Sequence, residues 1–149
     1  MKSEKFITAL FVILIQLYIS QNCFSQSVQE DLNGGRFKGK LAEETPPDVD
    51  RMPQVLDDIF AFQNGKISGE ILKKYSVNEC SYSAFIDEKR MVAVKVVKFT
   101  SECQGSLDGE NVNILITGEI YADLWMAGDI VIKMKDKADL KFRISAEAK

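Results

Sequence analysis

The sequence predicts an all-β domain, an antiparallel meander of about eight strands that follows an N-terminal signal-peptide helix. Three observations support this prediction. Apolar and polar residues alternate along most of the chain, short turn sequences separate the alternating segments, and no convincing amphipathic helix occurs after the first residues. Short connections place consecutive strands side by side in opposite directions. Eight such strands form a small up-and-down barrel or a strongly curved sheet.

The first 26 residues have the layout of a secretory signal peptide. Lys2 and Lys5 precede an apolar run over residues 6–19, and small and polar residues follow it. The run is shorter than the ~20 apolar residues of a spanning helix, so we expect cleavage after residue 25 or 26, export to the periplasm or beyond the cell, and no stable membrane span afterwards. An uncleaved anchor or a buried strand is one alternative. Lipid modification of Cys23 is another, although the preceding residues lack the pattern of a bacterial lipobox.

Charge and composition exclude several classes of function. The chain has 19 basic and 22 acidic residues and a net charge of −3, so it lacks the basic footprint of a nucleic-acid-binding protein. It has no histidine, the commonest general base and metal ligand. It also lacks a Gly-x-Ser-x-Gly elbow, a phosphate-binding glycine loop and a CxxC pair. We therefore predict a protein that is not an enzyme, has no metal or other cofactor, and has no nucleic-acid partner.

The N-terminal part of the exported chain carries weak signals. Residues 27–34 are polar, and we expect them to be disordered, before a single barrel-like domain over residues 35–149. Residues 35–41 have the pattern of a short edge strand, whose outward lysines discourage pairing with other chains. Residues 42–54 contain all three prolines and several acids, so they form a loop. A one-turn helix over residues 50–56 is weakly indicated.

A hairpin is expected next. Residues 59–62 form one strand, and Asn64-Gly65 is the dipeptide favoured in a type I′ turn, because both central residues need a positive φ. The pattern then predicts a strand over residues 66–75.

The middle of the chain alternates less clearly. Residues 80–86 form a strand, and the charged residues 87–90 form a turn. Residues 91–100 are rich in valine and form another strand. Residues 101–110 are polar and form a loop.

The strongest pattern runs over residues 111–135. Apolar or small residues occupy every second position in both arms of this segment, on either side of a break at Asp123-Leu124. A period of two means that each arm is a strand with one buried face, and the short break makes the pair a hairpin. Residues 136–139 form the last turn, and the final strand begins at Leu140.

Three strand segments share the form apolar-x-Gly-acid-Ile, and their glycines fall on the inward face: Gly69, Gly118 and Gly128. A glycine within a strand marks a bend, a bulge or a close approach, and we favour a bend. The alternative is that the glycines open a cavity for a ligand. The lining of such a cavity would be Ile67, Gly69, Ile114, Ile116, Gly118, Gly128, Ile130, Ile132, Phe142 and Ile144.

The acids that follow these glycines are Glu70, Glu119 and Asp129. A ring of carboxylates could serve a glycosidase or bind calcium. However, each acid follows an inward glycine and should point outward, so we expect a solvated outer face.

Tyr121 and Trp125 lie near the tip of the central hairpin, on the face opposite Gly128. Exposed aromatic residues can anchor a partner or a sugar. They can equally stabilise the hairpin through cross-strand contact, which we favour.

Cys80 and Cys103 are an even pair in a chain expected to be exported, so a disulfide is the default. If the turn at residues 87–90 pairs Ile86 with Met91, however, Cys80 lies opposite Val97, too far from Cys103 for a bond. A loop folding back would close this gap, and we keep the disulfide as the prediction.

The turn over residues 62–67, the glycine-acid-isoleucine hairpins and Phe142 resemble a scattered set of short, exported, uncharacterised bacterial β-proteins. This resemblance implies no catalytic residue. The strand count is also similar to that of lipocalin-like barrels, although their Gly-x-Trp signature is missing. Two functions follow as hypotheses. The first is a binding module for a small apolar ligand or an envelope component. The second is a structural or interaction module with a filled core, which meets an envelope protein through a strand edge or through Tyr121 and Trp125.

Overall fold

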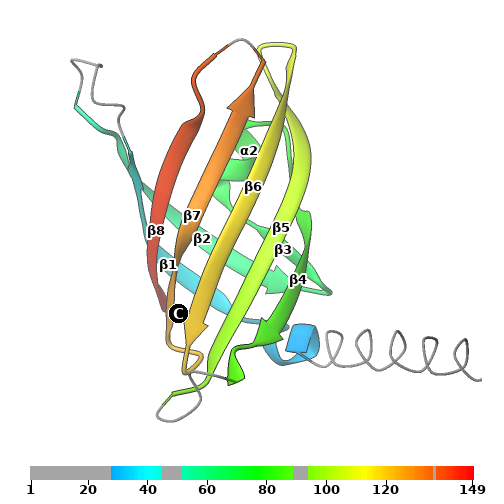
Figure 1. The fold of residues 1–149 in the computed structure, drawn as a ribbon, viewed down its shortest axis with the longest axis vertical. Coiled ribbons are helices and arrows are strands. Elements are labelled where there is room, and N and C mark those ends of the chain that lie inside the picture. Colours follow the sequence, from blue (N-terminus) through cyan, green and yellow to red (C-terminus); the bar gives the residue numbers. More distant parts are fainter. Residues whose placement is uncertain (1–27, 45–51, 89–93, 136) are drawn as a thin grey trace, which may run out of the picture.

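The structure is a computed structural model that describes residues 28–44, 52–88, 94–135 and 137–149. It is a closed antiparallel barrel of eight strands in chain order (Figure 1). This confirms the all-β meander and selects the barrel over the open curved sheet. The expected signal peptide, including Cys23, lies outside the described residues. The strands are β1 (Arg36–Glu43), β2 (Val55–Gln63), β3 (Lys66–Ser68), β4 (Cys80–Ile86), β5 (Val96–Leu107), β6 (Glu110–Tyr121), β7 (Trp125–Met134) and β8 (Leu140–Ala148).

The barrel closes between its first and last strands. Leu41 of β1 lies opposite Leu56 of β2 on one side and Ile144 of β8 on the other. The strand predicted at residues 35–41 is observed as β1, but its expected position at a sheet edge is wrong, because β1 is paired along both sides. The helical turn expected over residues 50–56 is also not observed in its described part, since residues 52–54 are irregular and β2 begins at Val55.

Side chains from all eight strands fill the interior. Phe62 is fully buried and makes edge-to-face contacts with Phe37, Tyr82 and Phe99, at centroid distances of 5.9, 5.2 and 5.2 Å. Each such buried side chain contributes roughly 1.5–3 kcal/mol of transfer free energy. The largest fully buried side chains are Phe60, Phe62, Leu41, Ile67, Leu72, Ile114, Ile116, Ile120, Met126, Ile130, Ile132 and Ile144.

A short helix, α2 (Glu70–Lys74), covers one end of the barrel and buries Ile71 and Leu72. Its first N–H groups find their acceptor in the buried carboxylate of Asp58: the amide of Glu70 donates to Oδ1 at 2.7 Å, and that of Ile71 donates to Oδ2 at 2.8 Å. The predicted strand over residues 66–75 is therefore wrong beyond Ser68. The acceptor that starts the helix lies on β2, where local alternation cannot reveal it.

The opposite end is covered by the N-terminal segment (Figure 1). Residues 28–32 are helical, and Val28 and Leu32 are buried in the core. The hydroxyl of Tyr82 donates to the carbonyl of Gln29 at 3.3 Å, and the side-chain amide of Gln29 donates to the carbonyl of Tyr82. Disorder over residues 27–34 is thus wrong for the described part, because two apolar side chains in an otherwise polar stretch are enough to anchor it.

The predicted turns of the two clear hairpins are confirmed. Asn64 and Gly65 have φ of 52° and 71°, as a type I′ turn requires. In the central hairpin Tyr121 lies opposite Trp125, and the turn between them holds Ala122 and Asp123 at φ of 49° and 58°. These two residues adopt the left-handed region without being glycine, which carries a steric cost.

The connection between β4 and β5 differs from the prediction. β4 spans the predicted residues 80–86. β5 runs from Val96 to Leu107, so the strand predicted over residues 91–100 begins later than expected in its described part, and the loop predicted over residues 101–110 is wrong as far as Leu107. The polar residues of β5 alternate with small inward ones such as Gly105. A Cβ on Gly105 would lie 2.3 Å from the carbonyl oxygen of Tyr75, so a small residue lets the segment after α2 pack closely.

The connection between β4 and β5 is longer than the predicted turn at residues 87–90, and this changes the register around the cysteines. Tyr82 lies opposite Ser101, and continuing this register by two residues brings Cys80 opposite Cys103. The two cysteines form a disulfide with a Cα–Cα distance of 5.7 Å. The disulfide prediction is confirmed, and the register that argued against it is wrong by six residues.

Candidate functional site

The residues predicted to line a ligand cavity lie in the core. The side chains of Ile67, Ile114, Ile116, Ile130 and Ile132 are fully buried, and Phe142 and Ile144 are at most 4% exposed. They pack with the aromatic cluster around Phe62 and with both end segments in one continuous core.

The inward glycines are positions of close approach. A Cβ on Gly118 would lie 2.6 Å from the ring of Phe99, and one on Gly128 would lie 2.2 Å from the carbonyl oxygen of Thr117. Neither distance is tolerated, so β6 and β7 come unusually close at this point and the ring of Phe99 occupies the space over Gly118. This favours the bend over the cavity. Gly69 differs from the other two, because it lies between β3 and α2 and its Cβ would meet the Asp58 carboxylate at 3.3 Å.

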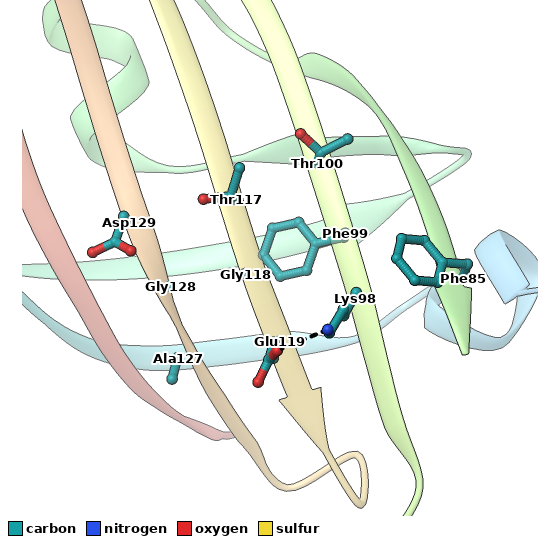
Figure 2. A pocket seen from close by; sticks show the side chains of 10 residues that line it. All are labelled: Phe85, Lys98, Phe99, Thr100, Thr117, Gly118, Glu119, Ala127, Gly128 and Asp129. Atoms are coloured by element: carbon teal, nitrogen blue, oxygen red, sulfur yellow. Dashed lines mark ion pairs between the residues drawn. The ribbon is translucent and has the colours of Figure 1, made fainter. Parts of the chain in front are cut away.

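Among the described residues, one candidate site is an open groove of about 440 Å³ on the outer face of β4, β5, β6 and β7 (Figure 2). This volume falls within the ~300–1,000 Å³ of small-molecule sites. The backbone of the two close-approach glycines forms part of the lining, and the outward side chains of the four strands form the rest. The groove is lined by Phe85, Lys98, Phe99, Thr100, Thr117, Gly118, Glu119, Ala127, Gly128 and Asp129.

An aromatic side chain stands at the β4 side of the groove. Phe85 is 53% exposed, whereas Tyr82 and Ala84 on the same strand are buried. Strand alternation turns Phe85 outward, next to Lys98 of β5. Sequence reasoning missed Phe85, although the strand pattern that turned Tyr82 and Ala84 inward already implied that Phe85 faces solvent.

A chain of charged groups fixes one side of the groove. The Lys98 ammonium lies 2.9 Å from a carboxylate oxygen of Asp87 and 3.5 Å from one of Glu119. The hydrogen bond to Asp87 is the main cause of the raised pKa of Lys98, so the ammonium stays charged. The hydroxyl of Tyr121 donates to the other oxygen of Glu119. Glu119 is thus held between a cation and a phenol.

A second line of side chains crosses the same face. The strand register places Ser83, Thr100, Thr117 and Asp129 opposite one another on β4, β5, β6 and β7, and all four are exposed. We call these four residues the hydroxyl row. Figure 2 shows Thr100, Thr117 and Asp129 side by side on three neighbouring strands. Asp129 is followed on β8 by Arg143, whose Nε lies 3.9 Å from Oδ1 of Asp129.

The three acids of the repeated motif do not come together in a ring. Glu119 and Asp129 both line the groove, but Glu70 lies on α2, where it is exposed and paired with Lys73 at 2.6 Å. Within the described ranges, no three His, Cys, Asp or Glu side chains are grouped as a metal site would need.

Tyr121 and Trp125 occupy the outer face next to the groove, as the sequence predicts. They are cross-strand partners, and Trp125 is 39% exposed beside the exposed Leu124. Tyr121 is connected to the groove through Glu119, a link that no sequence pattern indicated.

Comparison with known proteins found no match among family models, curated proteins or solved structures. Among the described residues, no helix is long and apolar enough to cross a membrane.

Proposed function

We propose that this chain is an exported, non-enzymatic binding module that meets its ligand or partner on the outer face of the barrel, at the groove over β4–β7. One observation carries the proposal: the interior is filled by its own side chains, whereas the outer face presents a groove with an exposed aromatic ring. The second hypothesis from the sequence, an interaction module with a filled core, is therefore preferred to a carrier of an apolar ligand.

The strand-edge form of that hypothesis finds less support than the face. β1 pairs with β8, so the edge expected at residues 35–41 is used within the barrel. Phe85 and Trp125, in contrast, expose 53% and 39% of their surface on the outer face of the barrel. Exposed aromatic side chains on a rigid surface commonly anchor a partner.

The leader layout and the disulfide support export. Disulfides form and persist in oxidising compartments. The Cys80–Cys103 disulfide joins β4 and β5, two of the four strands under the groove. N-terminal sequencing of the protein from its host's exported fraction tests this point, with a start at residue 26 or 27 expected.

A catalytic role has little support. The chain has no histidine, and the Glu119 carboxylate is already bound by Lys98 and Tyr121. A likeness to lipocalins rests on strand number alone and stays a prediction.

Native mass spectrometry of the exported protein tests the filled core. We expect the mass of the oxidised chain alone; an additional mass that is lost on denaturation, together with shifted methyl resonances of Ile116 and Ile130, would overturn the proposal. A second measurement tests the face. Binding of exported-fraction components by the wild type should be lost in Phe85→Asp and kept in Val55→Asp, an equally exposed apolar position on β2. Equal effects of the two substitutions would also overturn it.

A further inference from the structure

We propose that the groove binds a neutral glycan, with consecutive sugar units lying across the strands along the hydroxyl row. This inference rests on the proposed function, because it names the ligand class of the same face. It is carried by the juxtaposition of an exposed ring, a row of hydroxyls and a carboxylate on four paired strands.

The groove offers both kinds of contact that a sugar makes. A pyranose has an apolar C–H face and a rim of hydroxyl groups. The half-exposed ring of Phe85 can accept the C–H face. Thr100 and Thr117 each provide a hydroxyl that donates and accepts, and the Asp129 carboxylate accepts from neighbouring hydroxyls.

The charges favour a neutral ligand. The one cation of the lining, Lys98, is held by Asp87 and Glu119, and Asp129 lies beside Arg143. An anion would meet Glu119 and Asp129 directly, and a cation would compete with ion pairs that are already formed. A neutral polar molecule disturbs neither pair.

The spacing of the row suits a chain of sugars. Neighbouring strands lie about 4.8 Å apart, and the hydroxyl row advances by one strand at each residue, from Ser83 to Asp129. The advance of one sugar unit in an extended β-linked glycan is close to this spacing. Successive units can therefore meet successive side chains of the row.

The position of the groove disfavours two other ligand classes. An extended peptide gains affinity by pairing with an unpaired strand edge. β5, β6 and β7 are each paired on both sides under the groove, and the edge that β4 leaves without a strand partner after Ser81 lies at the rim of the groove rather than beneath it. A small apolar ligand needs an enclosed pocket, whereas this groove is open and carries the charged groups of Lys98, Glu119 and Asp129 in its lining.

Titration of the isotope-labelled, oxidised protein followed by NMR tests the proposal. The probes are cellopentaose and chitopentaose as extended neutral glycans, maltopentaose as a curved one, and pentagalacturonate as an anionic one. We expect the extended neutral probes to shift the amides around Thr117 and Asp129, and the anionic probe to bind at least tenfold more weakly. Thr117→Val keeps the branched shape without the hydroxyl and should weaken binding about tenfold. Phe85→Ala should weaken it at least as much, and Val55→Ala should leave it unchanged.

The outcomes separate the two proposals. Absence of shifts with every glycan at millimolar concentration, or shifts that persist in both Phe85→Ala and Thr117→Val, would overturn the glycan inference and leave the binding face intact. Shifts confined to the methyls of Ile116 and Ile130, on addition of a fatty acid, would instead overturn the proposed function itself. A folded spectrum for each variant excludes loss of structure as the cause.

Discussion

Removal of the Cys80–Cys103 disulfide should lower the free energy of unfolding by about 3.4 kcal/mol. The bond encloses a sequence separation of 23 residues, and the chain-entropy relation gives about 3.4 kcal/mol at 25 °C for a loop of this length. The cysteines lie opposite each other where β4 and β5 run side by side, so the folded backbone needs no rearrangement when the bond is absent and only the two side chains must move apart. The loss should therefore come mainly from the greater freedom of the unfolded chain.

Urea denaturation of the oxidised and the reduced wild type is the direct assay, because the two samples have the same sequence. A loss of about 3.4 kcal/mol corresponds to a fall in Tm of roughly 13 °C for a domain of this size. The slope of unfolding against urea should be larger for the reduced protein, since its unfolded chain exposes more surface. A Cys80→Ala/Cys103→Ala variant should behave like the reduced wild type. A difference below about 1 kcal/mol, with an unchanged slope, would refute the chain-entropy reasoning.

Three further predictions concern the backbone and the buried tyrosines. Gly128→Ala should destabilise the protein by at least about 2 kcal/mol in urea denaturation, because its Cβ has no space, whereas Ala127→Ser on the outer face should cost less than about 0.5 kcal/mol. Ala122→Gly should raise the free energy of unfolding by about 0.5–1 kcal/mol, since Ala122 has a φ of 49°, and an unchanged or lower midpoint would contradict this. Burial raises the pKa of Tyr75 and Tyr82 above 10.0, so the unfolded chain loses these protons first and stability should fall as the pH rises above 10. Tm measured from pH 8 to 11 should decline less steeply in a Tyr82→Phe variant, and an equal decline would count against this assignment.

Strand alternation was enough to predict the strands whose two faces differ strongly. The central hairpin, residues 80–86 and the Asn64-Gly65 turn are observed as the sequence indicates. In the strands, buried residues occupy every second position. In the turn, the backbone needs a conformation that few residue types adopt.

Connections and long-range partners could not be predicted in this way. The register of β4 against β5 depends on a loop whose length no local pattern fixes, and one wrong turn moved Cys103 six residues away from Cys80. The alternation of Ile67, Gly69 and Ile71 predicts a strand where the structure has α2. The Asp58 carboxylate that accepts hydrogen bonds from the start of this helix lies on β2, so no local pattern indicates it.

The candidate site was partly visible in the sequence. The glycine-acid motif contains four lining residues of the groove, Gly118, Glu119, Gly128 and Asp129. The motif predicts inward glycines, and on the inside of the barrel Gly118 accommodates the ring of Phe99 while Gly128 lies against the backbone of β6. The outer face of the same segment needed the strand register, because only the register brings Thr100, Thr117 and Asp129 into one row.

The core and the groove share their central residues, and this constrains how binding can be tested. Gly118 contacts the ring of Phe99 on the inside, and its backbone lines the groove on the outside. A substitution there changes packing and ligand contact together, so a loss of binding would carry no information about the ligand. Thr117 and Asp129 are exposed neighbours of the two glycines and contribute to the outer face. Substitutions at these outward positions separate recognition from stability, because the filled interior holds the barrel together whatever occupies the groove.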